Sequence, residues 1–70
     1  MKIILTRHAI EQIEDRKINF VWVQETVKFP DIMKKEDNKY YALKRLNGHV
    51  LKVVYVKEKY IKVITTFFVK

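Results

Sequence analysis

The hydrophobic positions of this chain recur with a helical period in its N-terminal half and with a period of two in its C-terminal half. From residue 7 to residue 17, Ala9, Ile10 and Ile13 stand at helical spacing, while the carboxylates among them point the other way. This pattern predicts an amphipathic helix of about three turns, and Thr6 is placed to cap it.

A second helix is predicted after a short connection. Asn19 is its expected cap, an apolar stripe at i, i+3 and i+7 begins at Phe20, and Pro30 must end the helix. Two helices joined by about three residues predict an antiparallel helical hairpin. Trp22 falls off the stripe, so we expect it to lie half-buried against a sheet rather than to bind a ligand.

From residue 31 onward, the period of two predicts strands. Asp37 to Lys39 supply turn residues, and Asn47-Gly48 is the strongest local signal, because both residues accept the positive φ of a type I′ turn. The predicted strands are 1–5, 31–36, 40–46, 49–56 and 60–69.

These elements predict an α+β fold with the order β-α-α-β-β-β-β. An N-terminal strand leads into a two-helix hairpin, which packs on one face of a four-stranded antiparallel meander. Seventy residues are too few for a second hydrophobic core, so we expect a single domain over residues 1–70.

A two-residue turn at Asn47-Gly48 also fixes which side chains share a face of the hairpin. One face is expected to carry Ala42, Lys44, Leu51, Val53 and Tyr55. The other is apolar enough to be the core except for two cations, and it is expected to carry Tyr41, Leu43, Arg45, Val50, Lys52, Val54 and Val56.

The two cations of this second face, Arg45 and Lys52, would be diagonal neighbours and would repel each other. A phosphate or a carboxylate between them would relieve that repulsion, which makes the pair a candidate anion site. The alternative is that both side chains extend into water at the end of the sheet.

Charge adds a partner class to this picture. Fifteen Lys and Arg against eight Asp and Glu give a net charge of +7, and after Asp37 the only acidic residue is Glu58. A basic surface of this kind attracts nucleic-acid phosphates, although a lysine-rich surface can also serve solubility alone. RNA is therefore the expected partner.

The same composition argues against other classes. The chain has no cysteine and only two distant histidines, so neither a metal nor another cofactor is predicted. The apolar runs are too short to cross a membrane and no signal-peptide core is present, so no membrane contact and a cytoplasmic location are expected.

Proton-transfer groups are available for metal-independent RNA cleavage, in which the 2′-OH of the RNA is the nucleophile. His8, Gln12 and Arg16 line one side of the first predicted helix, with His8 as a proton donor or acceptor and Arg16 as a phosphate clamp. The alternative is that both helix residues only contact water or serve the helix. The four tyrosines interleave with Lys44, Arg45 and Lys52 on the sheet, a pattern that suits base stacking but is also common in half-buried strands.

Four stretches carry a family resemblance: T-R-H-A-I-E-Q-I-E-D-R-K-I, V-K-F-P-D, H-V-L-K-V-V-Y-V and V-I-T-T. With them, the chain resembles a family of small uncharacterised prokaryotic domains that look like minimal relatives of the RelE/ParE toxin superfamily, including BrnT. The resemblance covers about residues 6–66. The chain departs from the family pattern at Gln12, where Arg is usual, and at Lys17, where Gly is usual.

The resemblance implies a RelE-like fold and a toxin-like, metal-independent endoribonuclease that acts on RNA, such as ribosome-associated mRNA, and is paired with an acidic antitoxin protein. Carried over to this chain, His8 and Tyr55 would be catalytic, and Arg16 and Thr65 would join Lys44, Arg45 and Lys52 in binding RNA phosphates. We expect the helix-borne residues to converge with the strand-borne cations on one hollow. The alternatives are a non-catalytic RNA-binding or protein-interaction module, and a ParE-like inhibitor of a protein target.

Overall fold

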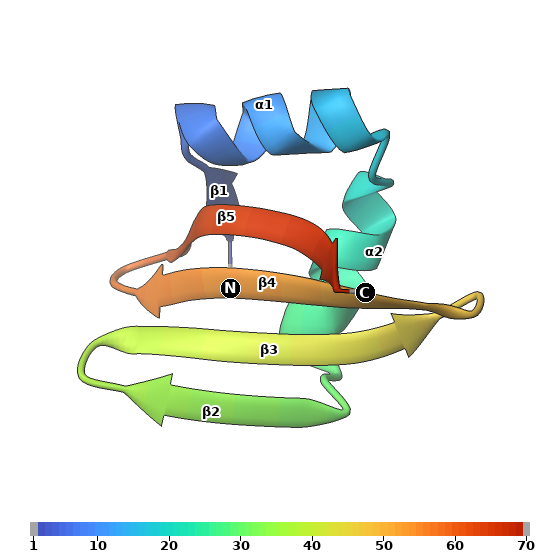
Figure 1. Ribbon diagram of the computed structural model, residues 1–70. Coiled ribbons are helices and arrows are strands. Elements are labelled where there is room, and N and C mark those ends of the chain that lie inside the picture. The colour runs from blue at the N-terminus through green and yellow to red at the C-terminus, as the bar shows by residue number, and fades with distance from the viewer. Residues whose placement is uncertain (1, 70) are drawn as a thin grey trace.

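The computed structural model describes residues 2–69 and contains two helices and a five-stranded sheet (Figure 1). The order of elements along the chain is the one the sequence predicts. Their bounds are β1 Ile3–Leu5, α1 Arg7–Arg16, α2 Phe20–Lys28, β2 Ile32–Glu36, β3 Lys39–Leu46, β4 His49–Lys57 and β5 Ile61–Val69.

The sheet has the strand order β1-β5-β4-β3-β2 and is mixed. Strands β2 to β5 form the expected antiparallel meander, but β1 joins them as a fifth strand, parallel to β5 and with Ile3 opposite Ile61. The expected four-stranded antiparallel sheet is thus incomplete. The residues of a tight turn predict a hairpin from the sequence. Strand β1, in contrast, pairs with a strand more than fifty residues away, and no local sequence pattern predicts that contact.

The central hairpin has the predicted register. Lys44 lies opposite Leu51 and Ala42 opposite Val53, and the turn residues Asn47 and Gly48 have φ of 53° and 83°. Both values lie in the left-handed region that a type I′ turn needs. The relative positions of the side chains on β3 and β4 were therefore set by this turn.

Both helices begin at the predicted caps. The Thr6 hydroxyl accepts a hydrogen bond from the Ala9 N–H at 3.1 Å, and the Asn19 side chain accepts one from the Val21 N–H at 2.9 Å. The Thr6 hydroxyl also donates to the carbonyl oxygen of Ile64 at 3.0 Å, which ties the start of α1 to β5.

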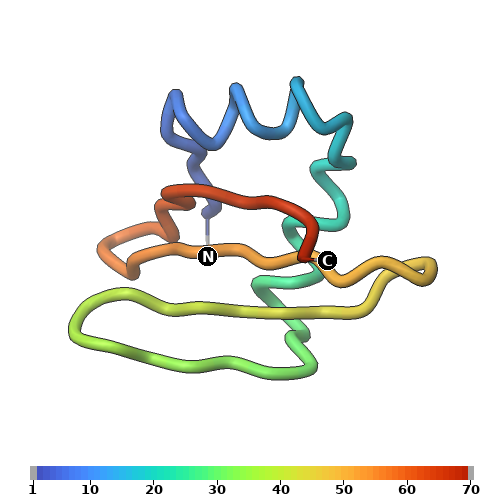
Figure 2. Tube along the Cα trace, viewed as in Figure 1, coloured from blue at the N-terminus to red at the C-terminus, as the bar shows by residue number. Residues whose placement is uncertain are grey.

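The helices pack on the same face of the sheet, but they do not form the expected antiparallel hairpin. Figures 1 and 2 show α1 running lengthwise above β5, while α2 descends steeply from the end of α1 behind the strands. Helix α1 contacts β5 and β1, whereas α2 contacts β4 and β3. Helix α1 runs along β5 whereas α2 runs across the strands, and the turn after Lys17, a residue with φ of 53°, redirects the chain between the two helices (Figure 1).

The core lies between the helices and the hairpin face that carries Ala42 and Leu51, not the face that carries Arg45 and Lys52. The second face is uncovered, and it carries two cations, Arg45 and Lys52, whose burial without partners would be costly. Trp22 is half-buried, with its ring edge-to-face to Phe68, as expected. The buried cluster is Ala9, Ile18, Val23, Val27, Ala42, Leu51, Val53, Tyr55, Ile61 and Val63.

Candidate nucleic-acid interface

The sheet face turned away from the helices, which we call the open face, is basic. Strand register places five cations on it against one carboxylate, Glu36. The rest of the open face is aromatic or aliphatic, including Tyr41 and Phe67. Its cations are Lys34, Lys39, Arg45, Lys52 and Lys62.

Lys52 lies at the centre of the open face between two aromatic rings. Its ammonium nitrogen is 5.4 Å from the ring centroid of Tyr41 on β3 and 5.8 Å from that of Phe67 on β5. Attraction to both ring faces holds the cation over the middle of the sheet. Among residues 2–69, Lys52 forms no ion pair with a carboxylate, so its charge is available to a ligand.

Arg45 lies toward the hairpin end of the same face. Register places it opposite Val50 while Lys52 is opposite Leu43, so the two cations are the diagonal neighbours that the sequence predicted. Beside Arg45 is a hollow of about 210 Å³, lined by Ile32, Leu43 and Val50 and also by Asp31 and Lys44, which are paired with each other. A positive charge next to a small apolar hollow suits a ligand that carries both a phosphate and a planar group.

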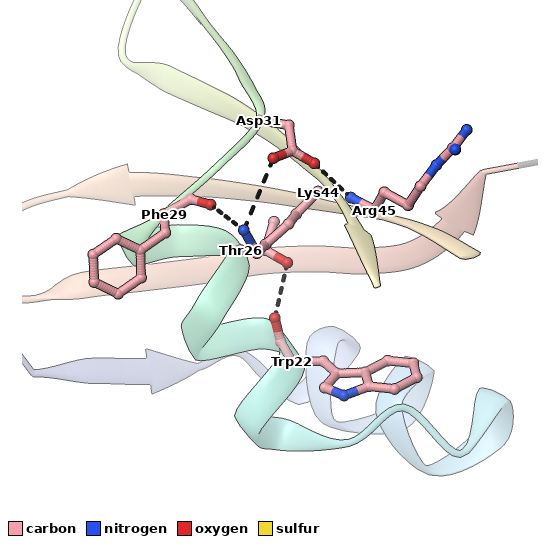
Figure 3. Close-up of polar contacts among 6 residues, drawn as sticks. All are labelled: Trp22, Thr26, Phe29, Asp31, Lys44 and Arg45. Atoms are coloured by element: carbon pink, nitrogen blue, oxygen red, sulfur yellow. Dashed lines mark hydrogen bonds and ion pairs between the residues drawn. The ribbon is translucent and has the colours of Figure 1, made fainter. Parts of the chain in front are cut away.

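Lys44, by contrast, points to the helix side, where its ammonium group contacts other residues of the protein (Figure 3). Its ammonium group donates a hydrogen bond of 2.8 Å to the carbonyl oxygen of Phe29, at the C-terminal end of α2, and lies 3.9 Å from Asp31 Oδ1. The Arg45 backbone N–H donates to Asp31 Oδ2 at 2.8 Å, while the Arg45 guanidinium extends away from this group. Lys44 therefore fastens the end of α2 to β3.

Tyr55 is also on the helix side, in the core. It is 3% exposed and its ring stacks on Tyr40, with the centroids 5.2 Å apart and the planes 7° from parallel. Burial raises the pKa of Tyr55 above its ordinary value of 10.0, and the nearby Tyr40 adds to the rise. A phenol with a raised pKa keeps its proton at neutral pH, so Tyr55 is a poor base for RNA cleavage.

The remaining candidates are divided between the two layers. His8 and Arg16 are exposed on α1, in the helix layer, and no hydrogen bond or ion pair within residues 2–69 joins them to a sheet cation. Thr65 lies on the open face opposite Val54. The expected convergence on one hollow is therefore wrong: Arg45, Lys52 and Thr65 share the open face, whereas His8, Arg16, Lys44 and Tyr55 do not lie on it.

Phe67, one of the two rings beside Lys52, was missed in the sequence. A bulge explains why, since Val54 pairs with Thr65 but Tyr55 pairs with Val63, leaving Ile64 as an extra residue. The bulge shifts the alternation of β5, so the residues after Ile64 face opposite to the direction that simple counting from Val63 gives. Only the pairing of β4 with β5 brings Phe67 beside Lys52.

Residues 2–69 contain no cluster of three or more metal-ligating His, Asp or Glu side chains, and none of their helices is long and apolar enough to cross a membrane. The site is thus a surface of cations and rings carried by rigid strands. It can attract phosphates and offer stacking surfaces to bases, whereas His8 and Tyr55, the two proton-transfer candidates named from the sequence, do not lie beside its cations.

These features define a class: a small α+β domain with two helices on one face of a mixed sheet and a basic, aromatic surface on the other. The chain belongs to the family described as a domain of unknown function, DUF4258, whose model matches residues 5–68. No curated protein and no solved structure matches the chain.

Proposed function

We propose that this protein is an RNA-binding module that holds single-stranded RNA on the open face of its sheet. The proposal rests mainly on Lys52, an unpaired cation held between the rings of Tyr41 and Phe67. Single-stranded nucleic acids are bound by this combination, in which cations neutralise phosphates while aromatic rings stack on exposed bases.

Single-stranded RNA fits better than duplex DNA for two reasons. A sheet face offers stacking surfaces that only unpaired bases can use, since the bases of a duplex are already stacked on each other. The RelE-like side of the sequence resemblance, which implies action on mRNA, favours RNA over single-stranded DNA.

Binding without cleavage is proposed because of where the proton-transfer candidates lie. A general acid or base must come within hydrogen-bond reach of the proton it moves, roughly 3 Å or one water molecule away. His8 is in the helix layer and Tyr55 is in the core, whereas Arg45 and Lys52 lie on the open face. An endoribonuclease on this face would have to use another base in place of His8 and Tyr55, such as the Glu36 carboxylate opposite Lys39.

The test is fluorescence anisotropy with a labelled oligouridylate of about 12 nucleotides, within the usual site size of such domains. Lys52→Gln should weaken binding and lower the slope of log affinity against log salt by about 0.7, the effect of one lost phosphate contact. Phe67→Leu should weaken binding by about 1 to 3 kcal/mol if it stacks on one base. Lys28→Gln, on the exposed side of α2, is the charge-matched control and should bind like the parent.

Two results would count against the proposal. One is the absence of salt-dependent RNA binding by the parent protein, and the other is equal affinity of the Lys52→Gln and Lys28→Gln variants. Incubation of the RNA with the protein in EDTA tests the alternative. Metal-independent cleavage that is lost in both His8→Ala and Arg45→Ala would favour a toxin-like endoribonuclease over a binding module.

A further inference from the structure

A second basic hollow lies on the helix side of the sheet, at the end that the helices leave uncovered. It measures about 480 Å³. Figure 1 shows that α2 reaches the sheet near the start of β2, far from the turn that joins β2 to β3. The hollow forms at that turn and at the end of β4, where it is lined by Lys35, Asn38, Tyr40, Val56, Lys57 and Glu58.

The floor of this hollow is the ring of Tyr40, which is held in place by its neighbours. Strand register puts Tyr40 directly between Lys35 on β2 and Tyr55 on β4. The ring stacks on Tyr55, and Tyr55 is itself buried in the core. Tyr40 is therefore a platform whose orientation is set by the packed interior and not by a mobile loop.

Two ammonium groups converge on that platform. The nitrogen of Lys57 is 4.9 Å from the Tyr40 ring centroid and that of Lys35 is 5.5 Å from it. Glu58 lines the hollow, yet neither lysine forms an ion pair with it or with any other carboxylate in residues 2–69. Two like charges drawn to one ring repel each other, and an anion between them would remove that repulsion.

We propose that this hollow is a second anion site, in which Lys35 and Lys57 hold a phosphate group above Tyr40. Three donors on each ammonium group can serve the oxygens of one phosphate. The site differs from the open face in its lysines and in the side of the sheet on which they lie. Its ligand carries a phosphate, supplied by an RNA backbone or by a small phosphorylated molecule.

The position of the hollow connects it to the open face. A neighbouring hollow of about 400 Å³ lies on the open-face side of the same turn, where its lining includes Lys39 and Tyr41 and also the carboxylates of Glu36 and Asp37. Asn38 and Val56 line both hollows. An RNA chain that leaves Tyr41 on the open face can therefore pass around this end of the sheet and reach Lys57. RNA as the source of the phosphate rests on the proposed function, whereas the anion site itself does not.

The experiment compares Lys35→Gln/Lys57→Gln with the charge-matched control Lys17→Gln/Lys28→Gln, whose two lysines are exposed and belong to the helix layer. Each protein is titrated with inorganic phosphate, followed by the amide NMR signals of residues 35, 40 and 57. Each is also titrated with oligouridylates of about 4 and about 12 nucleotides, followed by anisotropy. Circular dichroism confirms that both variants are folded.

If RNA supplies the phosphate, the double variant should lose roughly 2- to 30-fold in affinity for the longer oligonucleotide and little for the shorter one. Its salt slope should fall by about 1.4, as expected for two phosphate contacts. Phosphate-induced shifts at residues 35, 40 and 57 with no such loss would support the site and assign it to a small phosphorylated ligand.

The proposal is overturned if the double variant binds the longer RNA like its control and phosphate moves none of the three signals in the parent protein. That result would leave the open face untouched, because RNA binding there is tested by Lys52→Gln. Conversely, a Lys52→Gln variant that binds RNA like its control, while phosphate still shifts the NMR signals of residues 35, 40 and 57, would refute the proposed function. That result would support the second site.

Discussion

Lys44 and Arg45 are adjacent cations, and the structure predicts that they have separable roles. Lys44→Met keeps the aliphatic stem of the side chain and removes its charge and its bond to the Phe29 carbonyl. Arg45→Met removes the same charge one residue away, from a guanidinium that extends away from the Asp31 contacts. We predict that the first change lowers stability without changing RNA affinity, and that the second does the reverse.

The expected loss for Lys44→Met can be built from its contacts. The hydrogen bond to Phe29 lies at the surface, where water can replace it, so it contributes about 0.5 to 1 kcal/mol, toward the lower end for such bonds. The positive charge at the C-terminal end of α2 adds about 0.3 kcal/mol. The 3.9 Å pair with Asp31, whose side chain is 55% exposed, adds at most a few tenths. The sum is about 1 to 1.5 kcal/mol.

Urea denaturation followed by circular dichroism measures this loss. For a protein of this size, an m-value of about 1 kcal/mol/M converts it into a midpoint lower by about 1 M. Arg45→Met should move the midpoint by less than about 0.5 M, as surface substitutions usually do. An unchanged midpoint for Lys44→Met, together with RNA binding weakened as much as in Arg45→Met, would refute the structural role and return Lys44 to the phosphate-binding set.

Two further predictions concern stability. Lys17 caps the C-terminal end of α1 with φ of 53°, a conformation that suits glycine. Lys17→Gly should therefore raise the free energy of unfolding by about 0.5 to 1 kcal/mol. Lys17→Ala is the control in the urea assay and should not raise it. Because the pKa of Tyr55 is higher in the folded state, the unfolded chain loses this proton first, and stability should fall as the pH rises above about 10. Urea midpoints between pH 8 and 11 should therefore decline less steeply for Tyr55→Phe than for the parent, and equal slopes would contradict the assignment.

The candidate site was only partly readable from the sequence. The diagonal placement of Arg45 and Lys52 followed from one turn, because Asn47-Gly48 fixes the register of both flanking strands. Phe67 could not be placed, because the bulge at Ile64 reverses the alternation of β5 and is created by long-range pairing. His8 was assigned to the sheet cations although nothing in a helical period states which strands a helix will cover.

The sequence by itself determined the local structure of this protein. Helix caps at Thr6 and Asn19 and the left-handed turn at Asn47-Gly48 are short-range features, and each is satisfied by atoms within a few residues. They gave the order of elements and the register of the central hairpin correctly.

Only the tertiary structure decided which face of that hairpin is covered. Both faces contain aliphatic residues, and the uncovered one carries Arg45 and Lys52, which form no ion pair within residues 2–69 and would be costly to bury unpaired. The tertiary structure also decided that β1 pairs with β5 in parallel, and that His8 lies in a different layer from the open-face cations. These features depend on contacts between residues far apart in the chain, whose free energy no local pattern records.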